Sequence, residues 1–183
     1  MGCTVPWNSR PLGLACSNYP GDYYREFNPP GKFPFAVLGL NSELDVKADA
    51  SRDIMYERLS NLKKVVKQNG LDPLMVERKL LIMHHPPSKF HDNLHLFEDI
   101  NTLFGNIDIC LHGHLHESQS TIRTISGKTE YQYQVASLCG LEYFGEVYEK
   151  RSFGFSIGSI SRYGEIRVWP YVRELVSGNN RFV

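Results

Sequence analysis

The stretch Lys79-Leu80-Leu81-Ile82-Met83-His84-His85-Pro86-Pro87 decides the fold predicted for this chain. Its apolar run is short and stops abruptly at two histidines and two prolines, which is typical of a buried strand followed by a turn. A second run of the same kind, residues 107–111, leads directly into His112-Gly113-His114-Leu115-His116. Two buried strands of the predicted sheet therefore end in histidines.

Two helices and a further strand are predicted around the first of these strands. Residues 52–68 carry apolar side chains at helical spacing and are closed by Asn69-Gly70, and residues 93–104 carry a second such pattern. An earlier apolar run, residues 35–40, predicts another buried strand that ends at the turn Asn41-Ser42. The order strand, helix, strand, helix, strand predicts a layered α/β protein.

The two ends of the chain differ from this central part. Residues 1–32 alternate proline with glycine and predict an irregular, loop-rich lead-in. After His116 the apolar period changes to two, which predicts antiparallel strands at residues 121–125, 130–136, 153–161 and 165–172. We therefore predict a single domain over residues 1–183 with an antiparallel C-terminal extension.

Composition and charge exclude several classes of protein. The 183 residues are 42% hydrophobic and 22% charged, which suffices for one core and is unlike a disordered chain. Lys plus Arg and Asp plus Glu each number 20, so no nucleic-acid polymer is expected as a partner. No apolar run approaches the roughly 20 residues of a spanning helix, and no signal peptide is visible, so no membrane partner is expected. The four cysteines include no C-x-x-C pair, Cys110 is predicted to be a buried thiol, and a reduced, cytoplasmic setting is expected.

All seven histidines of the chain lie between His84 and His116. Because the carboxyl ends of parallel strands meet at one edge of a sheet, the histidines after the two strands are expected to share a cleft. Imidazole is a common ligand of zinc, manganese and iron. If the second segment stays extended, His112, His114 and His116 lie on one face. A single histidine after a strand is usually a surface or hydrogen-bonded residue, but two groups at equivalent strand ends predict a metal or catalytic site.

At these residues the sequence resembles the calcineurin-like metallophosphoesterase superfamily. That family carries five blocks, D-x-H, G-D-x-x-D, G-N-H-D/E, H-x-P and G-H-x-H, and the last two stand here as His84-His85-Pro86 and Gly113-His114-Leu115-His116. Residues 36–43 are similar to the strand between the third and fourth blocks, and residues 167–171 resemble the closing strands. The resemblance implies a layered α-β-β-α sandwich, here incomplete because only its C-terminal half is matched.

The resemblance also implies a chemistry. The family hydrolyses phosphoesters with two divalent metal ions, bridged by an Asp and by a hydroxide that attacks phosphorus in line. Carried over to this chain, His84 and His114 ligate the second metal and His116 ligates the first. The residues expected beside the metals or the substrate are His85, His112 and Asn41. For Asn41 a turn role is an open alternative. The metal can be manganese, iron, zinc, nickel or cobalt, and the substrate is a small phosphoester or nucleotide, with a phosphodiester preferred.

The first three blocks of the family have no counterpart in the sequence. The chain contains no D-x-H and no Asn-His pair, and Gly21-Asp22-Tyr23-Tyr24-Arg25 has Arg at the last position of the second block. The bridging Asp and the Asn ligand are therefore missing. We expect a truncated form of such an enzyme, weakly active or inactive as a phosphoesterase, with an exposed sheet edge that a partner chain can cover.

Two alternatives stay open at this stage. Residues 112–116 are a literal H-x-H-x-H, the core of histidine-triad nucleotide hydrolases, but Gly113 and Glu117 break that family's apolar pattern. The other alternative is a non-catalytic interaction protein that retains half of the fold. It predicts no bound metal and no effect of replacing the histidines, whereas sensitivity to a chelator favours the phosphoesterase over the triad enzyme.

Overall fold

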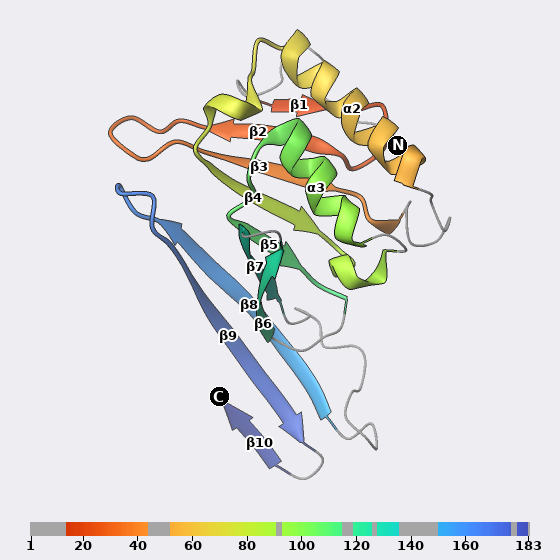
Figure 1. Ribbon diagram of the computed structural model, residues 1–183. Helices are drawn as coiled ribbons and strands as arrows, with labels where there is room; N and C mark the ends of the chain where they lie inside the picture. Colours follow the sequence, from red (N-terminus) through yellow and green to blue (C-terminus); the bar gives the residue numbers. More distant parts are fainter. Residues whose placement is uncertain are drawn as a thin grey trace.

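The computed structural model describes residues 14–43, 52–90, 93–114, 119–125, 128–135, 150–176 and 179–182. These residues form two β-sheets and two α-helices (Figure 1). The helices cover one face of the larger sheet, and the smaller sheet lies against its other face. The arrangement is an incomplete α/β sandwich, which confirms the predicted fold class.

The larger sheet has seven strands in the order β1-β2-β3-β4-β5-β7-β6. Its parallel part consists of β3 (Phe35–Leu40), β4 (Arg78–Met83), β5 (Ile109–His112) and β7 (Lys128–Gln134). The strands added antiparallel at its two sides are β1 (Leu14–Cys16), β2 (Tyr23–Phe27) and β6 (Gln119–Ile125). The three buried strands predicted from the apolar runs are β3, β4 and β5, so that prediction is confirmed.

The core lies between the larger sheet and its helices, α2 (Arg52–Gln68) and α3 (Asn93–Phe104), which have the predicted bounds. Two short 3-10 turns accompany them, η2 (Pro73–Met75) and η3 (Pro87–Lys89). Leu38 pairs with Leu81 and Leu81 with Cys110 across three strands, and each is at most 1% exposed. Cys110 is therefore the buried thiol that the sequence predicts. None of the helices in the described segments is long and apolar enough to span a membrane.

The smaller sheet consists of β8 (Lys150–Ile160), β9 (Ile166–Val176) and β10 (Asn179–Phe182), which pair antiparallel and include the predicted C-terminal hairpin. Ile160 and Val168 line, together with Leu80 and Leu111 of the larger sheet, a cavity of about 510 Å³. A hydrogen bond of 3.3 Å joins Ser156 Oγ of β8 to the Tyr133 hydroxyl of β7. These contacts set the two sheets face to face.

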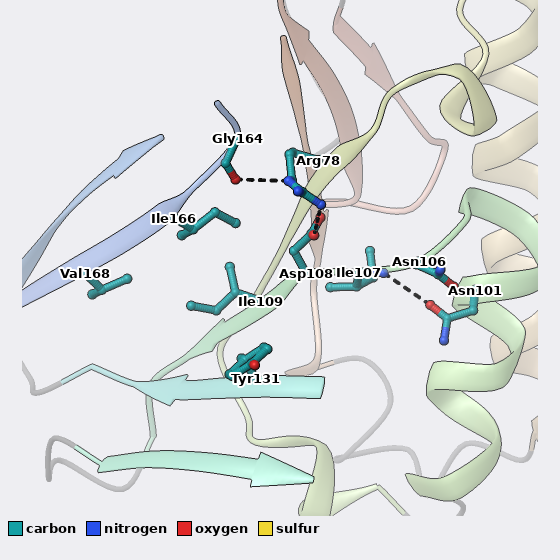
Figure 2. A pocket seen from close by; sticks show the side chains of 10 residues that line it. All are labelled: Arg78, Asn101, Asn106, Ile107, Asp108, Ile109, Tyr131, Gly164, Ile166 and Val168. Carbon is teal, nitrogen blue, oxygen red and sulfur yellow. Dashed lines mark hydrogen bonds and ion pairs between the residues drawn. The ribbon is translucent and has the colours of Figure 1, made fainter. Parts of the chain in front are cut away.

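Arg78 fastens the smaller sheet to the larger one at the amino ends of β4 and β5 (Figure 2). Its Nε donates to the carbonyl of Gly164 at 3.0 Å, and its Nη1 lies 3.0 Å from Asp108 Oδ1. Gly164 has a φ of +78°, and a Cβ there would lie 2.9 Å from Arg78 Nε, so two separate constraints favour glycine. The pocket that these residues border, about 530 Å³, lies at the opposite strand ends from the histidines.

Two predictions about the N-terminal region are wrong. Within residues 1–32, predicted as an irregular lead-in, β1 and β2 are strands that extend the sheet. Tyr24 is 0% exposed and pairs with Leu38, while the glycine-containing segment before it makes a turn in which Gly21 has a φ of +89°. Cys16 is disulfide-bonded, which contradicts the reduced state expected for the cysteines. Spacing along the chain did not exclude this bond, because folding can bring distant cysteines together.

Candidate metal site

Three histidine side chains converge at the carboxyl ends of β4 and β5. His84, His85 and His114 each offer one ring nitrogen, and these nitrogens lie within 4.8 Å of one another. The ring centroids are 4.8 Å apart for His84 and His85, 5.3 Å for His84 and His114, and 4.4 Å for His85 and His114. The two strands are parallel neighbours, and the main-chain N–H of Gly113 donates to the carbonyl of His84 at 3.0 Å. The strand ends are therefore tied together just where the rings meet.

The segment after β5 does not stay extended, which corrects the expectation that its three histidines share one face. The strand ends at His112, and His114 has a φ of +78°, the only positive φ of a non-glycine residue in the described chain. Such a conformation is uncommon for residues with a side chain, and strained residues gather at functional sites. This turn brings the His114 ring to His84 and His85. His116 lies outside the described residues.

Ser42 joins the end of β3 to the two histidines after β4. Its Oγ accepts hydrogen bonds from the main-chain N–H of His84 at 3.1 Å and of His85 at 2.8 Å. The same oxygen lies 3.2 Å from Nδ1 of the His85 ring. Ser42 is 0% exposed and His85 is 5% exposed, so bulk water does not compete for these bonds. One hydroxyl therefore fixes both the main chain and one ring of the cluster.

Glu43 places a carboxylate beside the cluster. Its Oε1 lies 3.9 Å from Nε2 of His84 and 3.7 Å from Nε2 of His85. Sequence reasoning missed both Ser42 and Glu43, although they lie within three residues of the end of β3, a parallel neighbour of β4. The rule that placed the histidines, that ligands gather at the carboxyl ends of parallel strands, applies to this third strand as well.

A buried ion pair supports the turn that carries Ser42 and Glu43. Arg58 of α2 binds Asp22 through Nε–Oδ2 at 2.5 Å and Nη2–Oδ1 at 2.6 Å, and its Nη2 also donates to the carbonyl of Asn41 at 2.9 Å. The Asn41 N–H donates to Asp22 Oδ1 at 2.8 Å. Helix α2 and the β1–β2 turn thus hold the end of β3 in place.

The other residues named from the sequence have different surroundings. The Asn41 side chain donates to the carbonyl of Pro20 at 2.8 Å and accepts from the Glu43 N–H at 3.2 Å, which is a turn role. His112 is 7% exposed and is not one of the three clustered rings; its Nδ1 lies 3.5 Å from the Gly113 carbonyl. Burial lowers the pKa of His112 below its usual value, and the bond to Gly113 offsets this only in part. His112 is therefore neutral near pH 7.

The cluster is open to solvent on one side. The His84 side chain is 53% exposed, whereas that of His85 is 6% exposed. Imidazole nitrogens suit zinc, iron, nickel and copper, and a neighbouring carboxylate adds negative charge that favours a cation. The arrangement can bind a divalent metal ion that is accessible to a small ligand.

No family model and no curated protein matches this chain. Several solved structures resemble it, among them the following two. GAP50, described as the anchor in the inner membrane complex of Plasmodium, aligns with 92% of this chain at 14% identity and a TM-score of 0.43. The sulfate thiohydrolase SoxB of Thermus thermophilus, solved in complex with glycerol, aligns with 90% of this chain at 14% identity and a TM-score of 0.41. The alignments span 53% of the GAP50 chain and 26% of the SoxB chain.

Proposed function

We propose that this protein is a hydrolase of small phosphoesters that uses a divalent metal ion held by His84 and His114. The observation that supports the proposal is the convergence of three imidazoles from two parallel strand ends, with nitrogens within 4.8 Å of one another. Three rings this close repel one another when they are protonated, whereas the neutral rings of His84 and His114 can offer lone pairs to one shared space. A cation is the ligand that such a space suits best.

The surroundings of the rings fit a catalytic metal better than a structural one. A divalent ion held there would supply Lewis acidity to a phosphoryl oxygen and to water. Half-exposed His84 leaves one side of the site open to a substrate, as catalytic metal sites require. Glu43, within 4 Å of two ring nitrogens, contributes a negative charge that attracts the cation.

The resemblance to metallophosphoesterases supplies the finer part of the proposal. It favours a small phosphodiester as the substrate and adds His116 as a further ligand. Among the residues that the structure describes, the cluster has imidazoles and one nearby carboxylate, and two-metal sites depend on anionic ligands shared between the metals. We therefore propose one firmly bound metal and slow turnover.

Elemental analysis after loading with manganese, zinc or iron and dialysis is the test. We expect about one metal per chain in the wild type and in His95→Ala, a control histidine on α3 whose side chain is 41% exposed. His84→Ala and His114→Ala are expected to retain less metal. The loaded wild type is expected to cleave bis(p-nitrophenyl) phosphate slowly, and a chelator is expected to stop the reaction.

Each alternative has its own result in these assays. A wild type that retains no metal would overturn the proposal and favour the non-catalytic interaction protein. Hydrolysis that persists in chelator would point to a triad-type nucleophile instead of a metal. Retention of metal by both His84→Ala and His114→Ala would place the metal elsewhere in the chain.

A further inference from the structure

We propose that Ser42 fixes His85 in the tautomer that carries its proton on Nε2, so that His85 donates a hydrogen bond to the substrate instead of ligating the metal. The substrate part of this inference rests on the proposed function, whereas the tautomer does not. The argument starts from the number of hydrogen bonds that one hydroxyl group can accept.

The Ser42 hydroxyl has two lone pairs and one proton. Both lone pairs are used, because Oγ accepts from the main-chain N–H of His84 at 3.1 Å and of His85 at 2.8 Å. A main-chain N–H can only donate a hydrogen bond, so Oγ must be the acceptor in both of these contacts. The contact of 3.2 Å between Oγ and Nδ1 of His85 must therefore use the hydroxyl proton, with Nδ1 as the acceptor.

An accepting Nδ1 determines the rest of the ring. A neutral imidazole with an unprotonated Nδ1 carries its proton on Nε2, and a protonated imidazolium would turn Nδ1 into a donor that faces a hydroxyl with no lone pair left. Ser42 is 0% exposed and His85 is 5% exposed, so water does not relieve such a conflict. The buried contact thus selects the neutral ring with its proton on Nε2.

This assignment divides the three clustered rings into two kinds. Nδ1 of His85 faces Ser42 and Nε2 carries a proton, so neither nitrogen offers a lone pair to a metal. His84 and His114 remain as the two metal-ligating rings of the cluster. The Nε2–H of His85 lies on the side of Glu43, 3.7 Å from Oε1, close to the ring nitrogens that would hold the metal. A donor in this position suits a non-bridging oxygen of a phosphoester, which is anionic and accepts hydrogen bonds.

The tautomer can be read directly from a long-range ¹H–¹⁵N correlation spectrum of the metal-free protein, with the His85 signals assigned by their loss in His85→Gln. We expect the pattern of a neutral ring protonated on Nε2. His112 is an internal comparison, because its Nδ1 faces a carbonyl that can only accept, at 3.5 Å, and it should show the opposite tautomer. A His85 ring protonated on Nδ1, or averaged between both forms, would overturn the inference.

Zinc and inorganic phosphate then test the role of the ring. We expect the Nε2 proton of His85 to persist in the zinc-loaded protein and its resonance to shift when phosphate is added. His84→Ala should weaken zinc binding by about tenfold or more relative to His85→Gln. Loss of the Nε2 proton on zinc binding would make His85 a ligand and overturn the inference while the proposed function stands. If zinc does not bind, the proposed function fails, and the tautomer of the metal-free protein still decides whether Ser42 sets the ring.

Discussion

Replacing Arg58 by methionine tests whether the ion pair beneath the β3 turn holds the candidate site in place. The guanidinium binds both carboxylate oxygens of Asp22 and the carbonyl of Asn41, and the two charged side chains are 4% and 1% exposed. Methionine keeps much of the volume but leaves a buried carboxylate without its cation. Removing one partner of a buried pair costs about 3–5 kcal/mol. With a urea slope of about 2 kcal/mol per molar, the midpoint of unfolding should fall by roughly 2 M.

Arg52→Met is the matched control. Arg52 also binds a buried carboxylate, Asp99, at 2.9 Å, but its own side chain is 44% exposed. Pairs that water can reach contribute about 0–1 kcal/mol, so the control should unfold near the wild-type midpoint. Adding Asp22→Leu to Arg58→Met should recover part of the loss, because it removes the uncompensated charge. Equal midpoints for Arg58→Met and Arg52→Met would refute the reasoning.

Three further predictions concern the sheet and the metal. Burial raises the pKa of the Tyr24 phenol, and nearby Glu26 raises it further, so the folded chain keeps a proton that the unfolded chain loses near pH 10. Stability should therefore fall as the pH rises above about 10. Between about pH 9 and about pH 11, the urea midpoint of Tyr24→Phe should fall less than that of the wild type. Gly164→Ala should lower the thermal stability of the protein more than Gly31→Ala does. Both glycines have a positive φ, which costs a residue with a side chain about 1–2 kcal/mol, but only at Gly164 would the new Cβ also meet other atoms. Equal losses of stability in the two variants would contradict this steric argument. Zinc at about 100 times its dissociation constant should raise the free energy of unfolding of the wild type by about 2.7 kcal/mol, measured by calorimetry. It should stabilise His84→Ala by much less, and equal stabilisation of the two proteins would exclude His84 as a ligand.

The central fold could be predicted because its signals are local. The apolar spacing of α2 and the short apolar runs of β3 and β4 are visible within single windows of the sequence. β1 and β2 were missed because their burial is not local. In β2 only Tyr24 is fully buried, and its neighbours in space are residues of β1 and β3. Prolines and glycines between these strands indicate turns, and turns also occur within sheets.

The candidate site could be predicted only to the level of strand ends. The rule for parallel strands placed histidines from β4 and β5 at one edge, and the structure brings His84, His85 and His114 together there. The rule could not separate ligands from their neighbours, because that distinction depends on hydrogen bonds such as those of Ser42. It also assumed an extended segment after β5, whereas the positive φ of His114 turns the chain. No feature of the sequence signals that turn beyond Gly113, which precedes it.

The site is a product of the whole sheet and not of any one segment. Ser42 and His85 are 43 residues apart in sequence, and Asp22 and Arg58 are 36 apart, yet both contacts are buried. The first separation follows from the parallel pairing of β3 and β4, because a helix must cross between parallel strands, and the entropy of closing both loops opposes contact until the sheet has formed. The three ring nitrogens therefore come together only in the folded state, and an ion bound there stabilises the entire central sheet. Metal affinity and global stability should consequently change together when the Arg58 support is removed, because Arg58 holds the end of β3 through Asp22 and the Asn41 carbonyl.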